Sequence, residues 1–279
     1  MTSPNAPRML TTDVPLTELT GEQLRARVAR AQLYLYQAQP VAGAPAPTTA
    51  QEHALLAHLH QLEQQGRLYG YGPLGHRGEG PMANVPALGI IAASSLADAE
   101  AMAAADPYVL ARLRTVGVRG HTMNEGVACY VGRALSRRLE ASGVRFSPNP
   151  GQVGLTRDEL AARAVGARLY LVEFVPTDKP RPKEDAQAGL DHFVWLRSNE
   201  MAARLMSCGP LEPLAPLSPG IWGGGLGVFA VGAEQAMRIA AEEPSGKRGY
   251  RIVTASPWTL ELGIAAPIAT ALTAVSVLR

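Results

Sequence analysis

The chain carries one motif twice, Leu19-Thr20-Gly21-Glu22-Gln23-Leu24-Arg25-Ala26-Arg27 and Leu155-Thr156-Arg157-Asp158-Glu159-Leu160-Ala161-Ala162-Arg163. Each copy continues with a second matching stretch, Ala31-Gln32-Leu33-Tyr34-Leu35 and Ala167-Arg168-Leu169-Tyr170-Leu171. The offset of 155 − 19 = 136 residues becomes 137 after one insertion and still relates Gly126 to Gly263. A single duplication of a domain-sized unit indicates two copies of one fold rather than a solenoid. We expect the first repeat, with an N-terminal tail, at residues 1–148 and the second at 149–279.

Composition excludes several classes of protein. The 279 residues are 47% hydrophobic and 18% charged, which is typical of a globular protein with room for two cores. The net charge is +2 and the basic residues are scattered, so no nucleic-acid partner is expected. Cys129 and Cys208 are not at equivalent positions and lack metal-ligand spacing, so both are predicted to be reduced. The segment from Met1 to Thr12 does not resemble a leader, and a cytoplasmic location is expected.

The segment from Leu262 to Leu278 has no charged residue and could be mistaken for a membrane span. It is short for a span and contains Pro267. Its counterpart in the first copy, residues 126–142, contains several charged residues. We therefore predict a helix covered by the other copy or by another subunit, with a homo-oligomer through this helix and no membrane partner.

The order of elements follows from hydrophobic periodicity and from Gly and Pro positions. After an N-terminal helix that begins at Thr20 or at Thr156, where Glu159 completes a capping box, each copy reads strand, helix, strand, strand, helix, strand. The predicted strands are 32–38, 67–71, 87–93, 114–119, 168–175, 204–208, 226–231 and 251–255, and the predicted helices are 49–65, 95–105, 186–203 and 233–242. This is the order of a ferredoxin-like unit. We expect an α+β fold with two βαββαβ repeats whose sheets pack face to face.

Three motifs resemble the YCII-related (YciI-like) family. They are Leu190-Asp191-His192-Phe193-Val194-Trp195-Leu196, Arg204-Leu205-Met206-Ser207-Cys208-Gly209-Pro210-Leu211 and Ala104-Ala105-Asp106-Pro107-Tyr108-Val109. The resemblance covers each copy almost end to end. It implies a dimeric α/β barrel related to muconolactone-isomerase-like proteins, here closed within one chain, with a catalytic His–Asp pair.

The two copies depart from the family pattern in complementary ways. The first copy keeps Asp106 but has Leu55 where the second has His192, and the second has Glu243 in place of the aspartate. We therefore expect one working site, with His192 and Glu243 as catalytic residues and Asp106 as a third candidate that could reach across the repeats. A carboxylate would fix the imidazole tautomer and raise its basicity. The competing interpretation is that His192 packs near a helix start with one hydrogen bond.

Five further residues are candidates for substrate binding. Arg204 and Arg67 recur at the same strand start and could hold a carboxylate, although a solvated strand end or a salt bridge to the neighbouring helix is at least an equal alternative. Tyr170 recurs as Tyr34 and could line a cleft or serve packing alone. Trp258 and His121 are equivalent and could close opposite ends of two cavities.

Two other patterns are set aside. His53, His58 and His60 lack the spacing of a helical metal site and are expected on a solvated helix face, so no metal site is predicted. The segment 222–227, Trp-Gly-Gly-Gly-Leu-Gly, precedes a strand rather than a helix, so it is predicted to form a hairpin or a cavity lip rather than a phosphate loop.

The leading hypothesis for function is a small-molecule lyase or isomerase that needs no cofactor and moves a proton on a ring-derived acid, lactone or carbonyl compound. The alternative is a non-catalytic ligand-binding or accessory protein in which the site has eroded. The third hypothesis is a haem protein, because other tandem ferredoxin-like chains bind haem through one histidine of the second copy.

Overall fold

The computed structural model describes residues 31–75, 82, 85–124, 126–129, 131–134, 154–183 and 185–277. The expected tail at Met1 to Thr12 and the expected helix at Thr20 lie outside these residues, as does the expected boundary between residues 148 and 149.

The order of elements confirms the tandem ferredoxin-like prediction. The first repeat consists of β1 (Ala31–Pro40), α2 (Thr49–Gln64), β2 (Leu68–Pro73), β3 (Ala87–Ile91), α3 (Leu96–Ala104), α4 (Pro107–Leu110) and β4 (Arg114–Met123). The second consists of α6 (Arg157–Ala161), β5 (Ala167–Pro176), α7 (Ala186–Met201), β6 (Leu205–Pro210), β7 (Gly225–Phe229), α8 (Ala233–Glu242), α9 (Pro244–Lys247), β8 (Arg251–Leu260) and α10 (Ala266–Val277). The four-residue helices α4 and α9 were not predicted.

Local capping explains where several helices begin. Thr48 and Gln51 form a capping box at the start of α2, and Thr156 with Glu159 forms the predicted one at α6. Each box satisfies backbone amides that the first turn of a helix leaves without intrahelical partners. The sequence therefore fixes the two helices that later pack against each other across the repeats.

Each repeat forms one antiparallel four-stranded sheet, in the order β2-β3-β1-β4 and β6-β7-β5-β8. Side chains alternate between the two faces of a strand. In β1, Leu33 and Leu35 therefore join one apolar cluster, whereas Tyr34 and Tyr36 join another beneath the helices. Each sheet thus has two buried faces.

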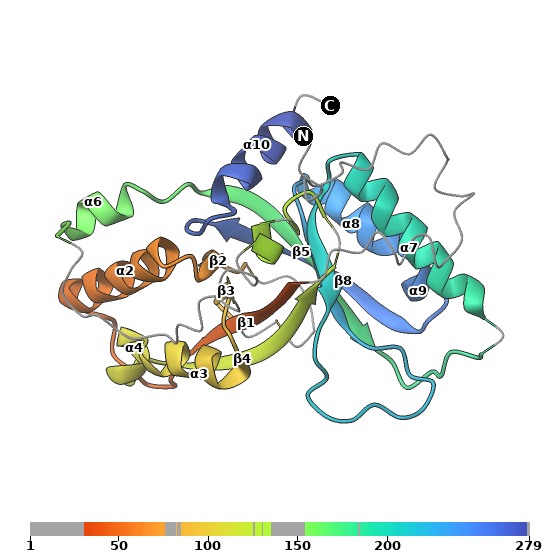
Figure 1. The fold of residues 1–279 in the computed structure, drawn as a ribbon, viewed down its shortest axis with the longest axis horizontal. Coiled ribbons are helices and arrows are strands. Elements are labelled where there is room, and N and C mark those ends of the chain that lie inside the picture. Colours follow the sequence, from red (N-terminus) through yellow and green to blue (C-terminus); the bar gives the residue numbers. More distant parts are fainter. Residues whose placement is uncertain are drawn as a thin grey trace, which may run out of the picture.

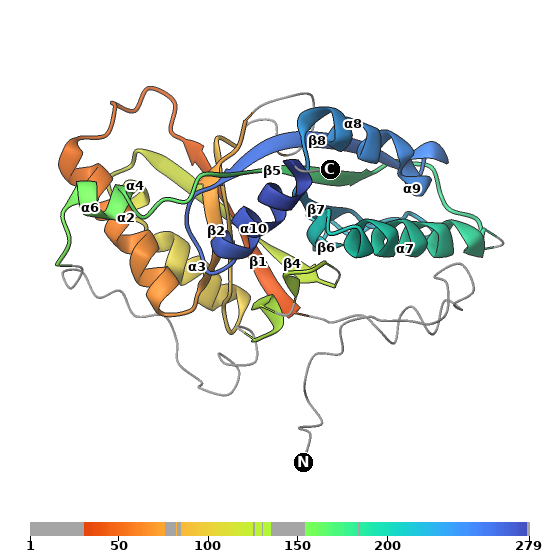
Figure 2. The same ribbon diagram turned by 90° about the horizontal axis from the view of Figure 1, so that it is seen from above.

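The two sheets pack face to face, as predicted, with α2, α3 and α4 on the outer side of the first sheet and α7, α8 and α9 on the outer side of the second (Figure 1 and Figure 2). The helix α6 lies beside α2 instead. The largest apolar cluster lies between the sheets and takes side chains from both, including Leu88 and Ile90 of the first repeat and Leu226 and Val228 of the second. Each sheet also has one smaller cluster between its outer face and its own helices. The chain is therefore an α+β protein with an intrachain pseudo-dimeric barrel.

Short backbone contacts between the repeats close the barrel. The amide of Asn124, after β4, donates to the carbonyl of Cys208 on β6 at 2.7 Å. Equivalently, the amide of Tyr71 on β2 donates to the carbonyl of Leu262, after β8, at 2.8 Å. Edge strands of one sheet are thereby paired with the other repeat, which removes open edges.

The C-terminal helix α10 covers the inter-sheet core. Ala266 and Ala269 are buried in that core, and Ile268 and Leu272 pack against it. The prediction of a covered helix is therefore met within the chain itself. In the described part of the chain, no helix is both long and apolar enough to cross a membrane.

The expectation of a solvated histidine face on α2 is wrong for two of its three histidines. His58 and His60 are both buried. His60 is covered by α6 of the second repeat, which packs against α2 (Figure 1), whereas His58 lies near Asp106 and Arg114 of its own repeat. The ring nitrogens Nε2 of His53 and His60 lie 2.9 and 3.1 Å from the carbonyls of Leu155 and Leu160. Helical periodicity does not reveal this contact between the repeats, which involves His53 and His60.

The closed barrel predicts a strong effect of adding one methyl group at Gly209. A Cβ atom there would lie 1.7 Å from the carbonyl oxygen of Thr122, so the strands would have to separate. Gly209→Ala should lower the free energy of unfolding by about 3 kcal/mol in urea denaturation. Gly154→Ala, whose Cβ meets nothing within 4 Å, is the control and should change it by less than ~0.5 kcal/mol. Equal stability of the two variants would contradict the close approach of the strands.

Candidate functional site

Two buried carboxylates occupy equivalent positions in the repeats, 243 − 106 = 137 residues apart. Asp106 is the N-cap of α4 and Glu243 is the N-cap of α9, and a proline follows each. Both side chains are fully buried. The unpredicted short helices therefore hold the two carboxylates in the same place beneath each sheet.

In the second repeat the carboxylate holds a histidine. Nδ1 of His192, on α7, lies 2.6 Å from Oε1 of Glu243. The other oxygen, Oε2, accepts hydrogen bonds from the Ser245 hydroxyl and the Gly246 amide, each at 2.6 Å. Because an ionised carboxylate only accepts hydrogen bonds, Nδ1 of His192 must carry a proton and donate it.

Burial sets the charge of this pair. Burial lowers the pKa of His192 below its ordinary value. The hydrogen bond to Glu243 acts in the opposite direction, but its effect is smaller. Burial acts to raise the pKa of Glu243, but the hydrogen bonds from His192 and Ser245 lower it to about 2. At neutral pH the pair is therefore a neutral imidazole beside a carboxylate ion.

The imidazole is surrounded by aromatic rings. The ring of Phe174 lies edge-on at 5.7 Å, that of Trp222 edge-on at 5.5 Å, and that of Trp195 stacked at 6.1 Å between centroids. His192 lines a pocket of about 190 Å³. Its other lining residues are Asn124, Phe174, Phe193, Leu196, Cys208, Gly209, Pro210, Trp222, Gly224, Gly225 and Arg251.

A buried arginine completes this pocket. Nε and Nη2 of Arg251 donate to the carbonyl of Gly223 at 2.9 and 2.5 Å. Its guanidinium lies 4.4 Å from the ring centre of Trp222 and 5.7 Å from that of Phe174. Burial lowers the pKa of Arg251 to about 10, so the group stays cationic at neutral pH.

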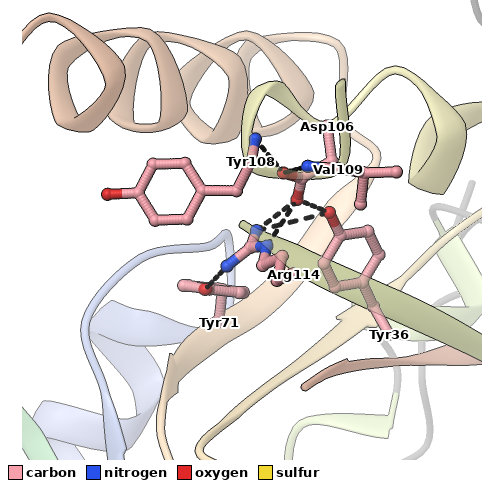
Figure 3. Close-up of polar contacts among 6 residues, drawn as sticks. All are labelled: Tyr36, Tyr71, Asp106, Tyr108, Val109 and Arg114. Carbon is pink, nitrogen blue, oxygen red and sulfur yellow. Dashed lines mark hydrogen bonds and ion pairs between the residues drawn. The ribbon is translucent and has the colours of Figure 1, made fainter. Parts of the chain in front are cut away.

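In the first repeat the same framework forms a closed polar network (Figure 3). Oδ2 of Asp106 accepts hydrogen bonds from the Tyr36 hydroxyl and from Nε and Nη2 of Arg114, and Oδ1 accepts from the amides of Tyr108 and Val109. Nη1 of Arg114 donates to the Tyr71 hydroxyl at 2.9 Å. Every polar group at the centre of this network has a partner within it.

Substitutions at equivalent positions account for the difference between the repeats. Leu55 replaces the imidazole of His192, and Asp106 is hydrogen-bonded by Tyr36 and Arg114 rather than by a histidine, although His58 lies close enough to interact with it electrostatically. Tyr71, which fills space beside Arg114, corresponds to the much smaller Cys208, which lines the pocket of the second repeat. The first repeat is thus filled with tyrosine side chains where the second has a pocket.

The structure brings together two of the three residues expected to be catalytic. His192 and Glu243 are hydrogen-bonded, whereas the described contacts of Asp106 all lie within the first repeat. Arg67 is buried and forms an ion pair with Asp98 of α3 at 2.9 Å, which is the alternative allowed from sequence. Arg204 is exposed at the start of β6.

The other predicted residues lie away from the His192 pocket. Tyr170 packs against the core beneath the second sheet, and Tyr34 lines a separate open cavity of about 430 Å³. Trp258 is buried between the sheets, where Nε1 donates to the carbonyl of Gly72 at 3.2 Å. His121 is buried near the Pro210 carbonyl, and burial lowers its pKa to about 4.

Sequence reasoning missed Arg251, Asn124 and Phe174. Arg251 had a usable signal, because Arg114 recurs 137 residues earlier at the start of the equivalent strand. Asn124 had none, since it reaches the pocket from the other repeat. Trp222 was noted as part of a hairpin or cavity lip, and it does line the pocket.

Comparisons with known proteins give structural neighbours only. No family model matches the sequence, and no match was found among curated proteins. The chlorite dismutase of Candidatus Nitrospira defluvii in complex with imidazole has 10% identity and a TM-score of 0.47, over 90% of this chain and 98% of that chain. A mutant of that protein in complex with cyanide has 11% identity and a TM-score of 0.46, over the same shares.

These comparisons correct the expected function. The matched structures are chlorite dismutases, so the expectation of a lyase or isomerase acting on a ring-derived acid is wrong. The same finding contradicts the alternative of a non-catalytic accessory protein with an eroded site. Neither function is retained.

The closed network of the first repeat predicts that its ion pair is required for stability. Asp106→Asn keeps an N-cap for α4 but leaves the buried Arg114 without its carboxylate. It should lower the free energy of unfolding by about 3–5 kcal/mol, measured by urea denaturation at neutral pH. Asp178→Asn removes an exposed carboxylate and serves as the control. Equal stability of the two variants would show that the network is dispensable.

Proposed function

We propose that the chain is a haem-binding protein in which Nε2 of His192 ligates the iron. The observation that carries this proposal is the hydrogen bond of 2.6 Å between Nδ1 of His192 and Glu243 inside an aromatic pocket. A histidine that binds a metal commonly donates its other ring nitrogen to a carboxylate, which fixes the tautomer and raises the basicity of the ligating nitrogen.

The donor chemistry fits an iron ligand. Metal binding requires a neutral imidazole, and the lowered pKa of His192 supplies one at neutral pH. In the described part of the chain, no hydrogen bond uses Nε2 of His192. Among the same residues, no group of three or more His, Cys, Asp and Glu side chains is placed to hold a bare metal ion. A haem would need only one side chain of this chain as an iron ligand, because the porphyrin itself supplies the other nitrogen ligands.

The walls of the pocket fit a flat apolar group. Phe174, Phe193 and Leu196 present apolar surface beside His192, and Trp222 presents a further ring. When bound, haem supplies an iron centre for redox chemistry or for binding small ligands. The residues of this chain would ligate, orient and shield that centre, with Glu243 holding the imidazole.

Room for a macrocycle depends on Trp222. The pocket of about 190 Å³ is smaller than the ~300 Å³ at the lower end of ligand sites. Trp222 belongs to the connection between β6 and β7, where residues 212–220 are exposed and Gly220, Gly223 and Gly224 give the backbone freedom. The proposal therefore requires the Trp222 ring to leave its position against His192 when haem binds.

Other expectations from the sequence stay proposals. Kinship to the YCII-related family is supported by the motifs around His192, Gly209 and Asp106. A cytoplasmic location is supported by the free thiols of Cys129 and Cys208. Pairing of two chains through α10 is supported by the absence of charged residues along that helix.

Titration of the haem-free protein with ferric haem tests the proposal. The wild type should develop an intense Soret band that saturates at one haem per chain, because the first repeat has Leu55 where His192 would be. His192→Ala should weaken haem binding by more than about a hundredfold, and Glu243→Gln by about tenfold to a hundredfold.

His53→Gln, which changes a histidine on α2 outside the pocket, is the matched control and should bind haem as the wild type does. Circular dichroism of each variant should match the wild type. A wild-type protein without a Soret change, or a His192→Ala variant that binds haem normally, would overturn the proposal.

A further inference from the structure

The pocket beside His192 contains a buried cation that no described carboxylate contacts, since Glu243 acts on it electrostatically but forms no ion pair with it. Arg251 is 8% exposed, and no described carboxylate lies within 4.0 Å of its guanidinium. Its hydrogen bonds, from Nε and Nη2, both go to one neutral acceptor, the carbonyl of Gly223. In the described part of the chain, Nη1 of Arg251 has no hydrogen-bond partner. A buried guanidinium normally requires an ionic partner to offset its lost hydration.

The first repeat shows what the equivalent arginine does when the site is closed. Arg114 lies 137 residues before Arg251 at the start of the equivalent strand and is neutralised by Asp106. In the second repeat the equivalent carboxylate, Glu243, instead bonds His192, Ser245 and Gly246. With Glu243 bonded to His192, Arg251 has no carboxylate hydrogen-bonded to it, and its guanidinium can bind one from outside the chain.

A second polar group in the same pocket also lacks a partner. Oδ1 of Asn124 is buried without a hydrogen bond, and Asn124 lines the pocket together with Arg251. Buried side-chain oxygens and nitrogens are almost always hydrogen-bonded, so such a group calls for a ligand. Rotation of the amide exchanges its oxygen and nitrogen, so Asn124 can accept or donate a hydrogen bond.

We propose that this pocket binds a carboxylate group, which Arg251 holds as its counter-ion and to which Asn124 donates a hydrogen bond. A carboxylate matches the planar, forked donors of a guanidinium better than a spherical anion does. The volume of about 190 Å³ accommodates a short aliphatic acid between Phe174 and Trp222. This chemistry has two sources, a free short-chain carboxylate or a propionate side chain of haem; only the second rests on the proposed function.

Propionate and its neutral isostere propionamide test the free source on the haem-free protein, with calorimetry and tryptophan fluorescence as readouts. Propionate should bind the wild type and alter the fluorescence of Trp222, and propionamide should bind about tenfold to a hundredfold more weakly. Arg251→Gln should lose the same factor for propionate. Arg251→Lys, which keeps the charge, should recover part of it, and this rescue excludes misfolding as the cause. Arg204→Gln, an exposed arginine of the same repeat, is the charge-matched control and should bind as the wild type does.

Haem and haem dimethyl ester test the second source, because the ester has no free carboxylate. If a propionate meets Arg251, the wild type should bind the ester at least about tenfold more weakly than haem, and Arg251→Gln should bind both equally. A preference for propionate without a preference for haem over its ester assigns the site to a free acid. If the protein discriminates neither propionate from propionamide nor haem from its ester, this inference is overturned, even if the Soret band appears and the proposed function stands. Propionate binding without a Soret band supports the inference and overturns the haem proposal.

Discussion

The backbone crossings that close the barrel are the constraint on which the rest of the structure depends. Each sheet would expose an edge strand if it stood alone, and here β2 meets the segment after β8 while β6 meets the segment after β4. The approach is so close that Gly72 and Gly209 face carbonyl oxygens of the other repeat. The same crossing carries Asn124 from the first repeat into the pocket of the second. The candidate site is therefore a product of the fused pair, and one repeat alone would lack part of its wall.

Within this symmetric frame, the partner of one carboxylate decides what each repeat can do. Asp106 and Glu243 are placed alike by a proline and a short helix, yet Asp106 neutralises Arg114 and Glu243 holds His192. In the first repeat the charges of Asp106 and Arg114 cancel each other, so neither group is available to a ligand. Because Glu243 binds His192 instead, the second repeat has a neutral imidazole, and Arg251 faces a pocket without a carboxylate in contact. Duplication allows this division, because either repeat can change while the other preserves the fold.

Much of the fold could be predicted from the sequence because it is locally encoded. Alternating apolar residues, proline stops and the capping box at Thr156 define elements that the structure confirms to within a few residues at most ends. The link between His192 and Glu243 followed from the repeat and the family resemblance. Contacts between repeats had no such signal. They cover His60 and bring Asn124 into the pocket, and each depends on how two distant segments meet. The Asp106 network within the first repeat had no signal either, because it joins side chains from separate strands and a short helix.

The central claim is that Glu243 holds His192 as a neutral imidazole whose Nε2 is available to a ligand. Nitrogen-15 NMR of histidine-labelled, haem-free protein at neutral pH tests this most directly, with His192→Gln used to assign the resonance. The account predicts that His192 carries its proton on Nδ1 and none on Nε2, because the carboxylate accepts from Nδ1. A His192 ring protonated on Nε2 alone, or on both nitrogens, would contradict it.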